Sequence, residues 1–143
     1  MCVNHPEGRI RFAGRHLFLL IASWGILVLV RLGLVLLPFR TVVLRRGGYL
    51  PARRRSLSPE VAVRAIGMAG RLVPGSTCLS RSLALKFLLR VAGIRSTLWI
   101  GVGPTPSVEF QAHAWLEADG RVLLGESKRG SFIPMVAIED RAS

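Results

Sequence analysis

Cys78 stands where a helix would begin, a position that suits a nucleophile. The surrounding residues 74–85 read PGSTCLSRSLAL, in which a Pro-Gly turn precedes two candidate capping residues, Ser76 and Thr77. In the first turn of a helix the aligned backbone N–H groups favour an anion, so a thiolate forms more easily there. Arg81 adds positive charge about one turn further on. The alternative interpretation is a buried cysteine that serves as a small apolar side chain.

His113 is the candidate base, and it lies in a segment with the alternation of a strand. Residues 110–117 read FQAHAWLE, so His113, Trp115 and Glu117 share one face while the intervening apolar residues share the other. An imidazole that takes a proton from a thiol makes a nucleophilic pair, provided that a third group orients the ring. A structural role is the alternative for a single histidine on a strand.

A hairpin is expected to bring one acidic residue to His113. Asp119-Gly120 is a strong signal for a two-residue turn, and regular pairing outward from that turn places Glu126 directly opposite His113. Residues directly opposite have Cβ atoms about 4.5–5.5 Å apart, so the Glu126 carboxylate would hold the imidazole. Asp119 is about 20 Å away along the strand and cannot do so. The predicted catalytic set is therefore Cys78, His113 and Glu126.

Two helices and a small sheet are the elements that must position these residues. Ser58 caps and Pro59 begins one helix, and the Cys78 helix follows with Leu83 and Phe87 on its predicted core face. Strand patterns come next, at residues 97–102, 110–117 and 121–126, whereas residues 132–135 are expected to pack loosely over the sheet. This order predicts an α+β fold, in which N-terminal helices precede a small antiparallel sheet.

The first part of the chain is apolar and then basic. Residues 17–38 read LFLLIASWGILVLVRLGLVLLP, long enough to cross a bilayer, although Arg31 interrupts them at a cost in lipid. Three interpretations are open: a transmembrane helix, a helix lying in the membrane interface, and a helix docked on the domain or on a partner. We therefore divide the chain into an apolar helix with a basic linker, residues 1–58, and the domain that holds the candidate site, residues 59–143.

The composition argues against several classes of function. The chain has 143 residues, a net charge of +12 and two cysteines, Cys2 and Cys78. Two cysteines make no disulfide framework, which favours the reducing cytoplasm, and Cys2 with His5 is too sparse for a metal site. No glycine-rich phosphate-binding motif occurs, so no cofactor is expected. Aromatic residues are few and are not interleaved with basic ones, which argues against nucleic acid. Two interpretations of the charge stay open: a solvated basic surface, and a surface that faces lipid or a peptide.

The residues around Cys78 and His113 resemble those of a known family. PGSTCLSRSLALKFLLRVAGI, LWIGV and FQAHAWLEADGRVL, in this order and spacing, are similar to the leader peptidases of lasso-peptide biosynthesis in their stand-alone protease form. Those enzymes belong to the transglutaminase-like superfamily of papain-type Cys–His–Asp enzymes, which implies a papain/transglutaminase-like fold here. The resemblance covers roughly residues 60–135. It implies Cys78 as nucleophile and His113 as base, with Glu126 where the family usually has an aspartate.

The resemblance also implies a reaction and partners. The chain would be a cysteine peptidase that removes the leader from a ribosomally synthesised precursor. A separate leader-recognition protein would present the leader, because residues 1–58 show no such domain, and a separate ATP-dependent cyclase would take the freed core peptide. Two alternatives stay open. One is transglutaminase-type acyl transfer to an amine by the same residues, and the other is a non-catalytic scaffold that binds a membrane or a partner through residues 17–38.

Overall fold

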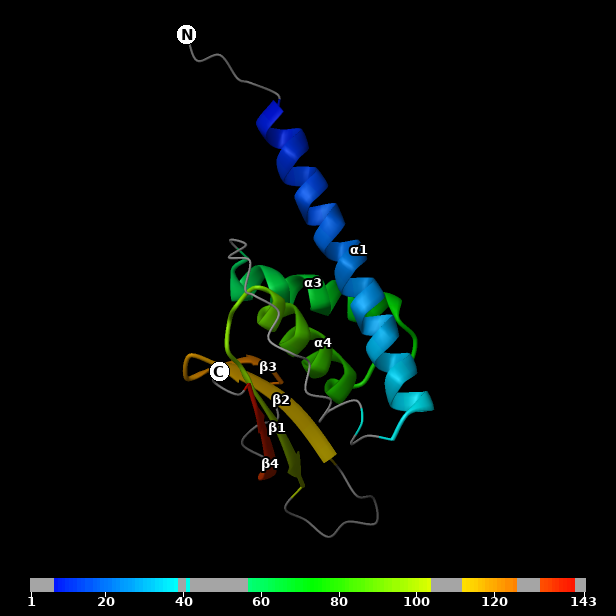
Figure 1. Cartoon of the computed structure of the whole chain (residues 1–143), viewed down its shortest axis with the longest axis vertical. Helices are drawn as coiled ribbons and strands as arrows, with labels where there is room; N and C mark the ends of the chain where they lie inside the picture. The colour runs from blue at the N-terminus through cyan, green and yellow to red at the C-terminus, as the bar shows by residue number, and fades with distance from the viewer. Residues whose placement is uncertain (1–6, 39–40, 42–56, 104–111, 126–131, 141–143) are drawn as a thin grey trace.

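The computed structural model describes residues 7–38, 41, 57–103, 112–125 and 132–140. Within these residues three helices precede four strands along the chain (Figure 1). The helices are α1 (Glu7–Leu36), α3 (Pro59–Leu72) and α4 (Cys78–Val91). The strands are β1 (Thr97–Val102), β2 (Ala112–Ala118), β3 (Arg121–Leu124) and β4 (Ile133–Glu139). The predicted α+β fold, with N-terminal helices and a small antiparallel sheet, is therefore confirmed.

The four strands form one antiparallel sheet in the order β3-β2-β1-β4. The expectation that residues 132–135 pack loosely over this sheet is wrong, because they enter β4, which pairs with β1 along its whole length. Pro134 has no N–H to offer a strand ladder. It is tolerated here because β4 is an outer strand of the described sheet, with only one neighbour.

The helices cover one face of the sheet, and the core lies between the two layers (Figure 1). α4 packs against β2 and β1, while α1 and α3 pack against α4 and against each other. The large apolar side chains without exposed surface come from both layers: Leu27, Ile66, Leu85, Leu89, Leu98 and Leu116. Of the two residues predicted on the core face of α4, Leu83 packs against this core, whereas Phe87 is 47% exposed.

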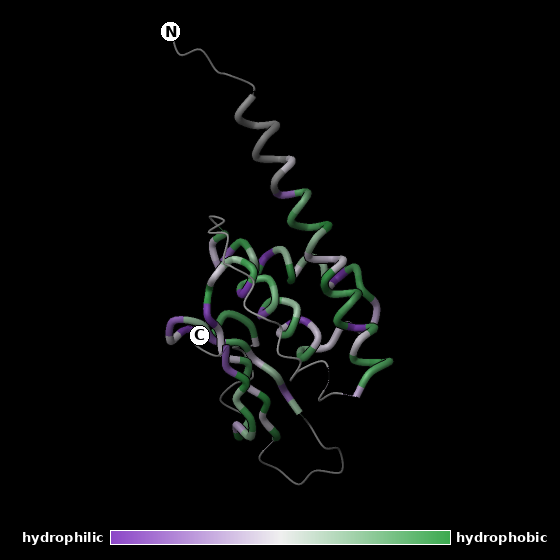
Figure 2. Tube along the Cα trace, viewed as in Figure 1, coloured by the Kyte–Doolittle hydropathy of each residue, from purple (hydrophilic) through white to green (hydrophobic). Residues whose placement is uncertain are grey.

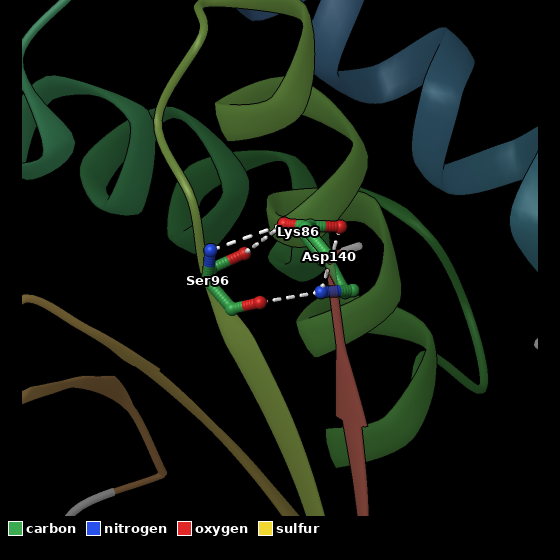
Figure 3. A network of polar contacts seen from close by, with 3 residues as sticks. All are labelled: Lys86, Ser96 and Asp140. Atoms are coloured by element: carbon green, nitrogen blue, oxygen red, sulfur yellow. Dashed lines mark hydrogen bonds and ion pairs between the residues drawn. The ribbon is translucent and has the colours of Figure 1, made fainter. Parts of the chain in front are cut away.

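A polar cluster of Lys86, Ser96 and Asp140 ties the end of the chain to the helices (Figure 3). Lys86 Nζ lies 3.0 Å from Asp140 Oδ1 and donates to the Ser96 carbonyl at 2.6 Å. The Ser96 N–H donates to Asp140 Oδ2 at 3.0 Å. Burial lowers the pKa of Lys86, while the hydrogen bond to Asp140 raises it. The cluster joins α4, the start of β1 and the residue that follows β4.

α1 is docked on the domain along one side. Ser23 and Leu27 are fully buried, and the helix packs against α3 and α4. Hydrophobic residues predominate along the coloured part of the helix, which includes residues 17–36 (Figure 2). The segment His16–Leu36 is long and apolar enough to cross a membrane by length and composition, although only 11% of it is buried in the domain. The division of the chain at residue 58 stays a prediction.

Candidate active site

Cys78 is the first residue of α4, and its position is fixed by a capping box. Thr77 is the N-cap, and its side-chain oxygen accepts from the Ser80 N–H at 3.3 Å. Ser80 Oγ in turn accepts from the Thr77 N–H at 2.9 Å. Of the two capping residues that the sequence left open, the structure selects Thr77. Cys78 is a free, half-buried cysteine at a helix start, where backbone N–H groups favour an anion, and it packs against the edge of the hydrophobic core.

Arg81 fixes the loop that leads into α4. Its guanidinium donates to Ser76 Oγ through Nε at 3.0 Å and through Nη2 at 2.8 Å. Nη2 also donates to the Gly70 carbonyl at 3.1 Å, and Ser76 Oγ donates to the same carbonyl at 2.8 Å. A Cβ on Gly70 would lie 2.6 Å from Arg81 Nε, so this arrangement requires glycine there. Arg81 therefore joins the end of α3 to the start of α4.

A second cation reaches the same loop from α1. A Cβ placed on Gly75 would lie 2.9 Å from Arg31 Nη2, so the Arg31 side chain rests against the turn three residues before Cys78. Gly75 has a φ of 69°, which favours glycine independently of the space around it. The charge that interrupts the apolar segment is thus turned toward the domain.

The start of α4 and the start of β2 lie at the same end of the two layers (Figure 1). A short connection joins α4 to β1, so the two elements run in opposite directions, and β2 is antiparallel to β1. The first residue of α4 and the second residue of β2 therefore come to the same end of the fold. Among the described residues, no hydrogen bond joins Cys78 Sγ to a ring nitrogen of His113.

The alternation predicted for β2 is confirmed, and it separates His113 from the core. Ala114 and Leu116 belong to the core beneath the helices, whereas His113 and Trp115 stack on the other side of the strand with ring centroids 6.3 Å apart. Phe132 also lies against the imidazole, at a centroid distance of 5.1 Å. In the described sheet, β3 pairs only with the last three residues of β2, so His113 stands beyond the paired part of that edge.

The predicted hairpin register is correct at the turn and wrong beyond it. Asp119 and Gly120 form a two-residue turn with φ of 50° and 73°, and the first two residue pairs match the prediction. A β-bulge then places Leu116 opposite Leu124, one residue further along the chain than expected. The bulge lets two consecutive residues, Leu123 and Leu124, both pack against the core, which regular alternation forbids.

The bulge removes the geometric argument that placed Glu126 opposite His113. Glu126 itself lies outside the described residues. The partner that the structure does give the imidazole is the preceding residue, since His113 Nε2 lies 3.1 Å from the Gly125 carbonyl oxygen. A carbonyl oxygen only accepts, so in this hydrogen bond Nε2 donates, and Nδ1 keeps the lone pair that a base needs.

Comparison with known proteins assigns the family. The model of the transglutaminase-like superfamily matches residues 26–137. This chain belongs to the transglutaminase-like superfamily. The superfamily includes cysteine peptidases and acyltransferases, and the match runs from within α1 to within β4, so it takes in both Cys78 and His113. Neither the curated proteins nor the solved structures contain a significant match to the chain.

Sequence reasoning missed one part of this transglutaminase-like domain, the aromatic cluster beside His113. Trp99 and Trp115 stack with ring centroids 6.3 Å apart. Both indole N–H groups donate to the Glu117 carboxylate, from Trp99 at 3.0 Å and from Trp115 at 3.2 Å. The shared face of His113, Trp115 and Glu117 was the available signal. Trp99 joins the cluster because it pairs with Trp115 across β1 and β2.

The candidate site can provide nucleophilic and acid–base chemistry. Cys78 offers a thiol at a helix start, and His113 offers an imidazole whose tautomer is set by a carbonyl. In the part of the chain that the structure describes, no group of three His, Cys, Asp or Glu side chains is arranged to hold a metal ion.

Proposed function

We propose that this chain is a cysteine peptidase that removes the leader from a ribosomally synthesised lasso-peptide precursor. One observation carries the proposal: a free cysteine is the first residue of a capped helix, at the same end of the fold as a strand histidine. Membership of a superfamily that includes cysteine peptidases supports the reaction class. The substrate follows from the resemblance of the residues around Cys78 and His113 to the lasso leader peptidases.

In the proposed mechanism, Cys78 Sγ gives its proton to His113 Nδ1 and attacks the carbonyl carbon at the leader–core junction. The Cys78 backbone N–H stabilises the resulting oxyanion, because the first N–H groups of a helix have no partner within the helix. The C–N bond then breaks, and the imidazolium returns the proton to the departing core amine. Water hydrolyses the thioester, which releases the leader carboxylate and restores the thiol.

His113 must come within hydrogen-bond reach of Cys78 for this chemistry, about 2.6–3.2 Å between the heavy atoms. Catalytic pairs in substrate-free enzymes are often further apart and close when the substrate binds. We propose that the peptide bound across this end of the fold brings the imidazole to the thiol. In the described structure the imidazole lies on the face of β2 away from the helices, beside Trp115 and Phe132, so the proposed movement must turn the ring around the strand toward α4.

We assign the orientation of His113 to the Gly125–Glu126 segment. The Gly125 carbonyl accepts from Nε2 at 3.1 Å and fixes the tautomer. Glu126 follows directly, and we keep it as the proposed third catalytic residue because it stands where the resembling family has its aspartate. A carboxylate near Nε2 would stabilise the imidazolium more strongly than a neutral carbonyl does.

The proposed reaction takes place in the cytoplasm with other proteins and without a cofactor. A separate leader-recognition protein presents the precursor, and an ATP-dependent cyclase joins the freed core amine to an acidic side chain. We therefore expect weak cleavage by this chain alone and faster cleavage when the recognition protein is added.

The second candidate is acyl transfer to an amine. The same Cys78 thioester would be attacked by an amine instead of water, and the superfamily includes acyltransferases. Product mass separates the two reactions, because hydrolysis leaves a free leader carboxylate and transfer leaves an amide.

The test combines precursor, recognition protein and the full chain, and follows leader release by mass spectrometry. We expect release with the wild-type chain and none with Cys78→Ala. Cys2→Ala is the matched control, since it removes the other thiol of the chain, and it should cleave normally. Circular dichroism would verify that both variants fold. Normal leader release by Cys78→Ala would overturn the peptidase assignment, and an amide product in added amine would favour the second candidate.

A further inference from the structure

α1 carries a continuous apolar stripe on the side that faces away from the domain. Its large side chains are between 46% and 75% exposed and recur at helical spacing: Leu17, Phe18, Ile21, Trp24, Leu29, Leu32, Val35 and Leu36. The stripe extends over about 30 Å of helix, at about 1.5 Å per residue. Soluble monomers rarely expose contiguous apolar surface on this scale, so the stripe is expected to be covered in the cell.

The stripe is free of charge because the one charged residue in its length points elsewhere. Between residues 17 and 36 the sequence has a single charged side chain, Arg31. Arg31 rests against Gly75, on the domain side, where Ser23 and Leu27 are fully buried. The cost of an arginine in lipid therefore does not apply to the exposed side of the helix.

We propose that α1 lies in the plane of an anionic lipid bilayer, with the stripe in the hydrocarbon and the opposite side on α3 and α4. An uncharged stripe with Phe18 and Trp24 suits the boundary between headgroups and acyl chains. The net charge of +12 suits anionic headgroups. Both features favour lipid over a second copy of the chain, which would bring two strongly positive molecules together.

The docking of α1 decides between lying on the membrane and crossing it. α3 and α4 pack along the second half of α1 (Figure 1), so a helix perpendicular to the membrane would carry them into the hydrocarbon. α3 exposes Arg64 and Arg71, which could not enter it without a large cost. With α1 in the membrane plane, the domain stays in water.

Removal of α1 as a signal sequence conflicts with the packing. Leu27 is part of the hydrophobic core, and the superfamily match begins at residue 26, within α1. A cut after α1 would take a fully buried leucine out of the domain. The helix therefore serves the fold on one side and, in our proposal, the membrane on the other.

Flotation of the purified full chain with vesicles tests the proposal. We expect binding to phosphatidylcholine vesicles that contain phosphatidylserine, and at least tenfold weaker binding to pure phosphatidylcholine. The double substitution Ile21→Asp with Leu29→Asp should reduce the bound fraction at least tenfold, because both residues lie on the stripe. Leu72→Asp is the matched control, since Leu72 is 72% exposed but lies on α3, and it should bind as the wild type does.

Each alternative occupant gives a different result. A transmembrane helix would keep the bound chain in the membrane during alkaline carbonate extraction, whereas a helix in the interface is extracted. A second copy as occupant would show as a dimer without lipid, lost in the double variant, and no vesicle binding. Resistance to extraction, such a dimer, or equal binding of the wild type and the double variant would each overturn the proposal. Circular dichroism should show the same fold for all variants, because the substituted positions are exposed.

Discussion

Gly125 is a residue whose backbone, not its side chain, serves the candidate site. Its carbonyl accepts from His113 Nε2 at 3.1 Å, and its φ of 90° is one that residues other than glycine rarely adopt. A Cβ there would lie 2.8 Å from Trp115 Cβ and 3.1 Å from His113 Nε2. The glycine thus permits the close approach that holds the imidazole.

We predict that Gly125→Ala slows leader cleavage at least tenfold, because the added methyl group displaces the His113 ring. The strained backbone should also lower the free energy of unfolding by about 1–2 kcal/mol. Gly120→Ala is the control: its φ of 73° imposes similar strain, yet nothing lies within 4 Å of a Cβ there. Mass spectrometry of cleavage and denaturant unfolding separate the two effects. Equal loss of activity in both variants would mean that strain alone, and not contact with His113, is responsible.

Glu126 can be tested against the acid at the turn. We predict that Glu126→Gln slows cleavage, by up to about 10⁴-fold if the carboxylate stabilises the imidazolium as orienting acids do elsewhere. Glu126→Asp should be milder, and Asp119→Asn should cleave almost normally because Asn-Gly makes the same turn. Cleavage rates of the three variants give the ranking. An active Glu126→Gln together with a crippled Gly125→Ala would leave the orienting role to the carbonyl alone.

At the scale of the elements, β4 is held to the helical layer by the ion pair between Lys86 and Asp140. Their side chains are only 11% and 13% exposed, and the Ser96 backbone completes the cluster. In a pair with so little exposure, removal of one partner lowers the free energy of unfolding more than removal of both, because the remaining charge stays buried without a counter-charge.

We predict that Asp140→Asn lowers the free energy of unfolding by about 2 kcal/mol at neutral pH, less than for a fully buried pair because both groups keep some exposure. The double variant Lys86→Met with Asp140→Leu should lose less free energy of unfolding than Asp140→Asn. Denaturant unfolding of the three proteins measures this. A double variant that is less stable than Asp140→Asn would contradict the argument.

The same variant has a predictable dependence on pH. Burial lowers the pKa of Lys86 below its ordinary value of 10.5, so above neutral pH the unfolded chain binds more protons than the folded chain. Stability then rises with pH in the window below 10.5. Asp140→Asn removes the interactions that raise the pKa of Lys86. The free energy of unfolding of the variant should therefore rise more steeply with pH, and its difference from the wild type should become smaller at alkaline pH. A deficit that widens there would mean that Lys86 is not the group responsible.

At the scale of the whole molecule, α1 belongs to both the core and the surface. Leu27 is fully buried in the same core as Leu85 and Leu116, although it lies outside the predicted domain of residues 59–143. Removal of the apolar segment would therefore take a fully buried side chain out of this core.

We predict that deletion of residues 1–37 abolishes cooperative thermal unfolding of the domain. Loss of one buried leucine side chain alone costs about 2–5 kcal/mol, a large part of a typical stability of 5–15 kcal/mol. Deletion of residues 1–15 is the control, because it leaves the docked part of α1 in place, and it should unfold like the full chain. Near-ultraviolet circular dichroism during heating measures both. A sharp transition at the wild-type temperature in the larger deletion would show that α1 is dispensable for the fold.

The sequence by itself determined the features that depend on neighbouring residues. The Ser58 cap with Pro59 after it, the start of a helix at Cys78 and the Asp119-Gly120 turn all follow from short-range hydrogen bonds and allowed backbone angles, and the structure confirms them. The α+β order of elements and the two faces of β2 follow from periodicity for the same reason.

Only the tertiary structure decided which distant residues meet. The bulge before Leu124 arises because two consecutive leucines find room in the core, and it broke the register that would have placed Glu126 opposite His113. Arg81 donates to Ser76 and Gly70, a partnership set by how α3 enters α4. These outcomes depend on packing between segments far apart in the chain, where small differences in volume and space select among patterns that local propensity leaves equivalent.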